Sequence, residues 1–368
     1  MSANYKKLGD YITQRREKNT AINLPICGVC REGLIPPKQQ DADISLYNVF
    51  YKNDFIFNPA RMELNSITLN TEYDKAICSS LYEIFYINDT SKLLPEFLFV
   101  QLKTDNFVRF CEFQGQGSVR EYCRFANISE YPVIVPDLKE QQKIVNTYNA
   151  ITKRIQLKQK INENLEKTAQ CLFENVFKHE LQKEEISFTD VIDLLGGGTP
   201  STAEKAYWSG NIPFFAPADI DKSVYCFKTE KTLTEEGLDN CSSKLYPKNT
   251  TFVTCRGTVG KLALAGTPMA MNQSCYALKD KNGQYPFFTY SFAKFTVSKL
   301  KNKASGAVFS ALVTKDFEME KVFNPNLEKM KEYETKSSSI FKNISSNEKE
   351  IFILQELKQL VISRISGM

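Results

Sequence analysis

The feature that most constrains this chain is a long internal repeat, in which the second half follows the first in the same order. The segment GSVREYCRFANISEYPVIVPDLKEQQK begins at Gly117, and GAVFSALVTKDFEMEKVFNPNLEKMKE begins at Gly306, an offset of 189 residues. At this single offset Pro136 is matched by Pro325. Such a repeat predicts two copies of one structural unit, because each copy must retain the positions that build its scaffold.

The match continues upstream with small gaps. YKNDFIFNPAR ends at Arg61 and YPKNTTFVTCR ends at Arg256, while LGDYI at residues 8–12 matches FTDVI at residues 188–192. The offset drifts between 180 and 196 along the chain, which is what insertions in surface loops produce. We interpret the matched arginines as a shared pair with a common phosphate-binding or structural role.

Short apolar and aromatic runs bounded by turn residues predict strands in each half. FIF at residues 55–57 and TFV at residues 251–253 are two such runs. PEFLFVQLKTDNFVRF, residues 95–110, and PFFTYSFAKFTVSKL, residues 286–300, each predict one helix with its apolar face toward the core. Each half therefore begins with a mixed globular part.

Each half ends in a stretch whose apolar positions alternate at spacings of three and four, the pattern of a helix with a heptad seam. Lys158 and Asn162 interrupt the first seam, and the same register recurs 189 residues later. At about 40 residues, each helix would be roughly 60 Å long, and so narrow a seam must be buried against another helix. The residues expected to pack in the helix pair are Ile144, Ile151, Ile155, Leu165, Leu172, Ile340, Ile344, Ile351, Leu354 and Val361.

The connection between the halves is short. The first helix is expected to end near Glu180 and the second globular part to begin near Ile186, so the second helix must run back along the first as an antiparallel partner. The alternative is that each helix packs only on its own globular part. The predicted fold class is α+β, with two mixed globular domains joined by two long antiparallel coiled-coil helices and an internal pseudo-two-fold repeat. A chain with approximate two-fold symmetry is expected to bind a target that also has two-fold symmetry, and duplex DNA is the leading example.

The predicted domains follow from the repeat. They are a first globular domain at residues 1–136, a central spacer helix at 137–185, a second globular domain at 186–325 and a C-terminal spacer helix at 326–368.

Composition argues against several classes of protein. No apolar run reaches the about 18 residues of a membrane span, and the N-terminus lacks an apolar signal core, so we expect a cytoplasmic chain without a membrane partner. The single histidine, His179, and the lone Cys27-Gly-Val-Cys30 pair argue against a catalytic triad and a zinc site. The ten cysteines are expected to be reduced and mostly buried. The net charge of +4 is small, so any contact with nucleic acid must come from local basic clusters.

The glycine run at residues 196–198, followed by Thr-Pro-Ser, raises the question of a nucleotide site. A P-loop requires G-x-x-x-x-G-K-S/T at the start of a helix, and a dinucleotide site requires G-x-G-x-x-G; this stretch has neither. We expect a surface loop in which the glycines adopt positive φ. The adenine-methyltransferase tetrad Asn/Asp-Pro-Pro-Tyr/Phe is also missing from the sequence, and no catalytic or metal-binding residues are predicted.

Four stretches form a recognisable set. GGTPS at residues 197–201 is followed by YWSG and IPF, RGTVGK occupies residues 256–261, NQS occupies residues 272–274, and YPVIVPDLKEQQKIV occupies residues 131–145. Together they resemble the specificity (S) subunit of type I restriction–modification systems, over essentially the whole chain. The second long helix lacks the Glu-Gln pair of the first, and the first globular domain lacks the GGTPS start.

The resemblance implies that each globular domain is a target-recognition domain that reads one half of a split, double-stranded DNA site. It implies that the helices set the spacing and dock two modification (methyltransferase) subunits, which bind S-adenosylmethionine and methylate adenine. Restriction (helicase-nuclease) subunits would join and use ATP. The chain itself would be non-catalytic and bind no cofactor.

The two halves of a split site usually differ, so the two domains should share scaffold residues and differ where they read bases. Arg120 and Arg124 are matched by Phe309 and Val313, and arginine can read guanine O6 and N7 in the major groove. The DNA-binding candidates are Arg61, Gly117, Ser118, Arg120, Arg124, Thr199, Ser201, Arg256, Lys261, Lys303 and Ser310.

Two alternatives stay open at this point. The chain could be the specificity part of a type IIB-like methyltransferase and nuclease assembly. It could also be a coiled-coil scaffold that binds proteins and no DNA, although a scaffold would not need two diverged globular domains.

Overall fold

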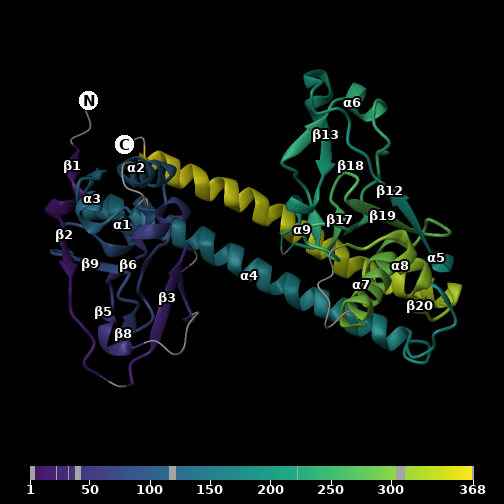
Figure 1. The fold of residues 1–368 in the computed structure, drawn as a ribbon, viewed down its shortest axis with the longest axis horizontal. Helices are drawn as coiled ribbons and strands as arrows, with labels where there is room; N and C mark the ends of the chain where they lie inside the picture. The colour runs from purple at the N-terminus through teal and green to yellow at the C-terminus, as the bar shows by residue number, and fades with distance from the viewer. Residues whose placement is uncertain are drawn as a thin grey trace. The chain divides into compact units, whose positions relative to one another are not determined.

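The computed structural model describes residues 5–21, 23–31, 33–37, 43–115, 122–221, 223–303 and 311–366. The chain divides into two compact units (Figure 1). The first comprises Met1–Arg154 with Leu354–Met368, and the second comprises Ile155–Ile353. Both long helices therefore contribute residues to both units.

Two four-stranded sheets form the body of the first unit. Their strand orders are β2-β9-β6-β7 and β4-β3-β8-β5, and a separate pair joins β1 to β10. The strands are β1 (Lys6–Lys7), β2 (Ile12–Arg15), β3 (Ile26–Cys30), β4 (Gly33–Ile35), β5 (Asn48–Tyr51), β6 (Phe55–Phe57), β7 (Ile67–Leu69), β8 (Lys75–Cys78), β9 (Glu83–Ile87) and β10 (Pro132–Val133).

The central strand β6 confirms the prediction made from the run FIF. Successive side chains of a strand point to opposite faces, and all three residues of β6 are buried because each face of the strand meets a core. Phe55 and Phe57 belong to the larger apolar core of the unit, and Ile56 belongs to the smaller core between the two sheets.

The helix predicted over residues 95–110 is in fact two helices. The segment forms α1 (Pro95–Gln101) and α2 (Asp105–Gly115). The break falls at Thr104, whose side-chain oxygen donates to the carbonyl of Gln101 at 2.8 Å and accepts from the amide of Phe107 at 3.2 Å. A hydroxyl that bonds nearby backbone groups in this way starts a new helix. The remaining short elements are η1 (Leu8–Asp10), η2 (Ile44–Leu46), η3 (Pro59–Leu64) and α3 (Phe125–Ser129).

The second unit contains a five-stranded sheet of order β12-β19-β16-β17-β14 and a three-stranded sheet of order β15-β13-β18, with a separate pair β11-β20. The strands are β11 (Ile186–Ser187), β12 (Ile192–Gly196), β13 (Trp208–Phe215), β14 (Tyr225–Cys226), β15 (Lys231–Leu233), β16 (Thr251–Thr254), β17 (Leu262–Ala265), β18 (Ala270–Met271), β19 (Cys275–Asp280) and β20 (Lys321–Val322). The helices are α5 (Phe188–Val191), η4 (Lys205–Tyr207), η5 (Pro217–Asp219), α6 (Glu235–Asp239), α7 (Pro286–Lys303) and α8 (Thr314–Met319). Helix α7 contains the helix predicted over residues 286–300, and β16 contains the predicted strand.

The repeat in the sequence is also a repeat in topology. The order β2-β9-β6-β7 in the first unit corresponds to β12-β19-β16-β17 in the second, and β1-β10 corresponds to β11-β20. The apolar pattern of β16 repeats that of β6, because Val253 faces one core of its unit and Phe252 faces another. The two halves of the chain are thus two copies of one α+β arrangement.

The two long helices are α4 (Leu138–Val176) and α9 (Leu327–Ser366). In the second unit they pack antiparallel (Figure 1), since rising numbers in α4 meet falling numbers in α9. Lys158 donates to Asn347 at 2.8 Å, whereas Tyr333 donates to the carbonyl of Ala169 at 3.2 Å. The expected end of the first helix near Glu180 was a few residues too far, since α4 ends at Val176.

The first unit contains the other parts of the two helices. Ile144 and Tyr148 of α4 share its core with Ile362 and Ile365 of α9, and the Lys358 ammonium lies 4.5 Å from the centre of the Tyr148 ring. The helices therefore contact each other and also the globular parts of both units, so the two alternatives for their packing are not exclusive.

Burial follows the predicted seam. Ile144, Ile151, Ile155, Ile344 and Ile351 are buried, and the other five predicted packing residues are half-buried. Those five are Leu165, Leu172, Ile340, Leu354 and Val361.

No helix in the described part of the chain is long and apolar enough to cross a membrane. Seven of the ten cysteines are buried and all ten are free thiols, as expected from their scatter.

Candidate nucleic-acid interface

One end of the main sheet in the first unit collects polar side chains from segments far apart in the sequence. Strand register places Arg15 of β2 beside Ile84, and Phe57 of β6 beside Glu83. The segment before α3 returns to the same end, where the amide of Cys123 donates to the carbonyl of Pro59 at 3.0 Å.

A chain of hydrogen bonds links four side chains at this end. The Arg16 Nε donates to the Gln14 Oε1 at 2.8 Å, and the Gln14 Nε2 donates to a Glu83 carboxylate oxygen at 3.3 Å. The other carboxylate oxygen of Glu83 pairs with an Arg124 Nη at 3.4 Å, and the amide of Phe125 also donates to Glu83, at 2.7 Å. Glu83 is 16% exposed and Arg124 is 63% exposed, so a half-buried carboxylate holds an accessible arginine.

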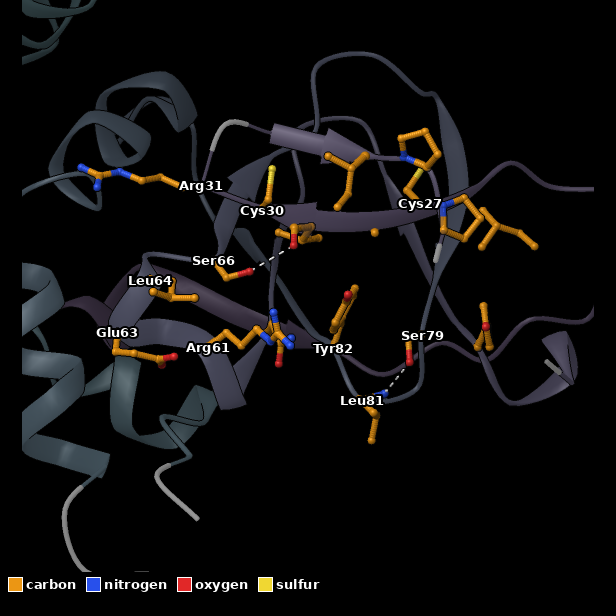
Figure 2. A pocket seen from close by; sticks show the side chains of 18 residues that line it. Cys27, Cys30, Arg31, Arg61, Glu63, Leu64, Ser66, Ser79, Leu81 and Tyr82 are labelled. Atoms are coloured by element: carbon orange, nitrogen blue, oxygen red, sulfur yellow. Dashed lines mark hydrogen bonds between the residues drawn. The ribbon is translucent and has the colours of Figure 1, made fainter. Parts of the chain in front are cut away.

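Arg61 lies in η3, next to this network, and its side chain is exposed. It lines a cavity of about 760 Å³ together with Tyr82, Arg31 and Glu63, which Figure 2 labels. The cavity is bounded by the hairpin of β3 and β4, by η3 and by the turn between β8 and β9. The residues that line the cavity carry charges of both signs, because Glu63 lies among them with Arg61 and Arg31.

The equivalent end of the sheet in the second unit contains the glycine run. Gly198 donates its amide to the carbonyl of Met271 at 3.1 Å, and Thr199 is hydrogen-bonded to Gln273. A Cβ at Gly197 would overlap the carbonyl oxygen of Asn272, and one at Gly198 would overlap the side chain of Ser242. The expectation of positive φ was wrong, because no glycine of the run has it. These glycines are required by close approach of backbone to backbone.

Ser201, the last residue of the GGTPS motif, is exposed, and its carbonyl accepts a hydrogen bond from the Trp208 indole at 3.1 Å. The structure thus accounts for the spacing between the glycine run and the YW pair by a backbone contact of the loop.

The RGTVGK segment forms the tight turn between β16 and β17. Gly257 and Gly260 adopt φ of +74° and +70°, a conformation that favours glycine. Arg256 at the start of the turn is exposed, and its backbone pairs with that of Ala311. This end of the sheet is thus built from the same segments as in the first unit.

Lys261 ends that turn and is exposed beside a second lysine. The Lys301 Nζ donates to the carbonyl of Gly260 at 2.7 Å. Burial and the neighbouring Lys261 charge lower the pKa of Lys301. An anion between the two ammonium groups would relieve this repulsion.

Four of the predicted DNA-binding residues, Gly117, Ser118, Arg120 and Ser310, lie outside the described residues. Lys303 is the last residue of α7, and its side chain also lies outside them. The described candidates Arg61, Arg124, Thr199, Arg256 and Lys261 all lie at the equivalent sheet ends of the two units or in the adjoining loops.

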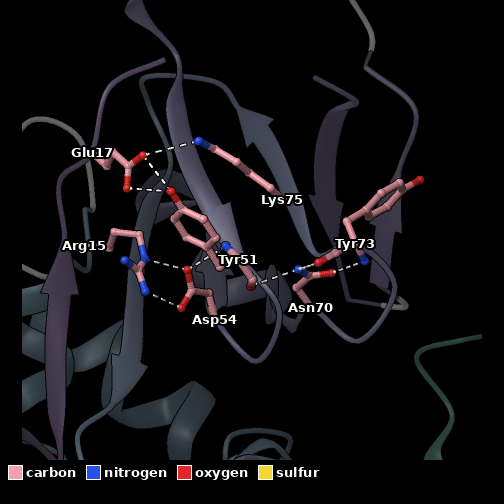
Figure 3. A network of polar contacts seen from close by, with 7 residues as sticks. All are labelled: Arg15, Glu17, Tyr51, Asp54, Asn70, Tyr73 and Lys75. Atoms are coloured by element: carbon pink, nitrogen blue, oxygen red, sulfur yellow. Dashed lines mark hydrogen bonds and ion pairs between the residues drawn. The ribbon is translucent and has the colours of Figure 1, made fainter. Parts of the chain in front are cut away.

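Not every arginine near this end is available to a ligand. Figure 3 shows Arg15 facing Asp54, to which it donates at 2.6 and 3.1 Å. Its guanidinium also lies 4.7 Å from the ring centres of Tyr51 and Tyr86. Asp54 is 1% exposed, so this ion pair stabilises the domain and leaves Arg15 engaged.

Sequence reasoning missed Gln14, Arg16 and Glu83. The sequence contained a signal for Arg16, because this residue follows the matched LGDYI block and differs between the two halves. Its counterpart at the local offset of 180 is Gly196. It also missed the role of Gln141 in the Glu-Gln pair. That buried side chain accepts from the Leu94 amide at 2.8 Å and anchors α4 to the start of α1.

The family model for the type I restriction modification DNA specificity domain matches residues 35–167 and again residues 181–359. The chain belongs to this family. Each match begins in a globular part and ends within a long helix, so the family's specificity domain occurs twice, in the two halves of the internal repeat.

Relatives in this specificity family have the same designation. The type I restriction enzyme MjaIX specificity subunit of Methanocaldococcus jannaschii is 30% identical over 172 residues, which are 46% of this chain and only 40% of that protein. The HindI specificity subunit of Haemophilus influenzae is 22% identical over 376 aligned positions, covering 81% of this chain and 82% of that protein.

The fold is similar to a solved one. The crystal structure of a type I restriction-modification system S subunit from M. genitalium matches with a TM-score of 0.60 and 12% identity, over 99% of this chain and 96% of that one. The family match and the fold similarity therefore point to the same kind of protein.

Proposed function

We propose that the chain is the DNA-recognition subunit of a type I restriction–modification complex, and that each unit reads one half of a split DNA site. The observation that carries this proposal is the pair of equivalent sheet ends. Each has a matched arginine, Arg61 or Arg256, beside residues that differ between the units. The phosphate backbone is the same in both half-sites, so an arginine present in both units can bind it. The bases differ between the half-sites, so the residues that read them should differ between the units.

The long helices are proposed to act as a coiled-coil ruler that sets the distance between the half-sites. We propose a pseudo-two-fold relation between the halves, supported by the common offset of 189 and by the antiparallel helix contacts. The domain boundaries that go with it are residues 1–136 and 186–325 for target recognition and residues 137–185 and 326–368 for the spacer helices.

We further propose that the chain is non-catalytic and works in the cytoplasm with two methyltransferase subunits, docked through the helices, and with restriction subunits. S-adenosylmethionine and ATP are proposed to bind those partners. In support, the sequence contains neither the methyltransferase tetrad nor a P-loop, and the described residues at both sheet ends include exposed polar side chains that a ligand could contact.

The test is methylation-sensitive sequencing of the host genome with the gene present and with it deleted. The proposal predicts a split, adenine-methylated motif that disappears on deletion. An unchanged set of methylated motifs in an otherwise active methyltransferase background would refute it and favour a protein-binding scaffold.

A further inference from the structure

We propose that Arg16 is a base-reading residue of the first domain and contacts guanine, with Gln14 and Glu83 as its positioning residues. The inference rests on the proposed function of DNA recognition and adds a residue that determines specificity.

The geometry fixes one side of the Arg16 guanidinium and leaves the other available. Its Nε donates to Gln14 at 2.8 Å, and Gln14 is itself held by Glu83 at 3.3 Å. Among the described residues, the two terminal amino groups of Arg16 have no hydrogen-bond partner, and the side chain is exposed.

This is the arrangement that bidentate recognition needs. Guanine presents O6 and N7 in the major groove, and the terminal amino groups of an arginine can donate to both at once. A long side chain loses rotamer freedom when it binds, and an arginine already oriented by a neighbour loses less. Gln14 supplies that orientation before DNA arrives.

The same carboxylate holds a second arginine. Glu83 pairs with Arg124 at 3.4 Å, so it aligns two guanidinium groups that come from different segments. The low exposure of Glu83, at 16%, keeps its negative charge away from the phosphate backbone while its partners project outward. One half-buried acidic residue can therefore organise the reading surface of the domain.

The second unit lacks all of these groups. The counterparts of Gln14 and Arg16 at the local offset of 180 are Leu194 and Gly196, and Gln273 and Thr199 lie at the equivalent sheet end instead. Two domains that read different half-sites require such a difference.

The experiment uses the full chain with its methyltransferase partners, expressed in a host that lacks their methylation. The methylated motif is mapped for the wild type, Arg16→Lys, Arg16→Ala and Gln14→Met. Lysine keeps the charge but loses the planar fork. We expect Arg16→Lys to relax one base pair in a single half-site, with discrimination reduced about 5- to 150-fold, and Gln14→Met to cause a smaller relaxation at the same base pair.

The matched control is Arg109→Lys. Arg109 is an exposed arginine of the same unit and lines a different cavity with Tyr131 and Ile365. The methylated motif of this variant should be the same as that of the wild type. Thermal melting of each chain shows that the variants fold. An unchanged motif in Arg16→Lys overturns the inference, and so does a uniform loss of methylation in Arg16→Ala with the motif intact, which indicates a phosphate contact. If the wild type itself yields no split motif, that result contradicts the proposed function of the chain. A split motif in the wild type that Arg16→Lys leaves unchanged contradicts only the role of Arg16.

Discussion

Lys158 and Asn347, which occupy equivalent positions in the two repeats, are hydrogen-bonded to each other across the helix pair, with 2.8 Å between Nζ and Oδ1. Both residues lie in the second unit, where the two long helices run antiparallel. Asn347 also donates to Asn162, and Lys158 pairs with Glu350, both at 2.8 Å. A polar set within an apolar seam favours one register over its neighbours, so these residues help to fix the register of the two helices within the second unit.

The apolar seam on either side should provide the stability. Leu165 is half-buried against the cluster that contains Ile344 and Phe341, so Leu165→Asp places an unpaired charge there. We expect the free energy of unfolding to fall by about 2–4 kcal/mol, measured by chemical denaturation. The control is Leu157→Asp, because Leu157 on the same helix is 53% exposed. Equal stability of the two variants would count against the packing.

Two carboxylates of α9, the buried Glu348 and the half-buried Glu334, make stability depend on pH. Burial raises the pKa of Glu348 to about 7, although the amides of Val224 and Tyr225 donate to it at 2.7 and 2.8 Å. Burial also raises the pKa of Glu334 to about 7. A carboxyl whose pKa is higher in the folded chain contributes stability that is fully present below about pH 4.5 and is lost as pH rises through 7.

The Glu348→Gln variant removes this titration. We expect the wild type to lose about 1–3 kcal/mol relative to Glu348→Gln between pH 5 and pH 8, as measured by denaturation at each pH. Glu356→Gln, at an exposed position of the same helix, should follow the wild type. Parallel stability curves for the wild type and Glu348→Gln would show that the carboxyl does not titrate in this range.

The matched arginines should behave as phosphate contacts. We expect Arg61→Ala and Arg256→Ala each to weaken binding to all duplexes alike. The slope of log affinity against log salt concentration should fall by about one, because about one fewer counterion is released on binding. Arg120→Ala and Arg124→Ala should instead relax one position of a single half-site, at about 1–3 kcal/mol. Equilibrium binding of the assembled complex at several salt concentrations separates the two behaviours. A change of motif in Arg256→Ala would assign that residue to base reading.

The chain alone should bind neither S-adenosylmethionine nor ATP, because it has no methyltransferase tetrad and no P-loop. Titration calorimetry with the purified chain is expected to give no heat of binding for either compound. Micromolar affinity for either one would require a site of its own on this chain and would contradict the assignment of cofactors to the partners.

The repeat made much of the fold predictable. The offset of 189 and the seam gave the long helices, because periodic patterns over tens of residues average out local exceptions. Single contacts were less accessible: Thr104 divides a helix that periodicity reads as one, and Gly197 is required by a carbonyl 75 residues away in sequence. The role of Arg16 depends on Gln14 and Glu83 being brought together by strand pairing, which no local pattern reveals.

The most direct test of the account is a domain exchange read out as a methylated motif. Residues 186–325 are replaced by the matching domain of a specificity subunit with a different target, and the motif is mapped by sequencing after expression with the methyltransferase partners. Two independent reading domains predict that one half-site changes to that of the donor while the other half-site and the spacer length stay as they were. If both half-sites changed together, or if neither changed in an active complex, the claim that each unit reads its own half would be contradicted.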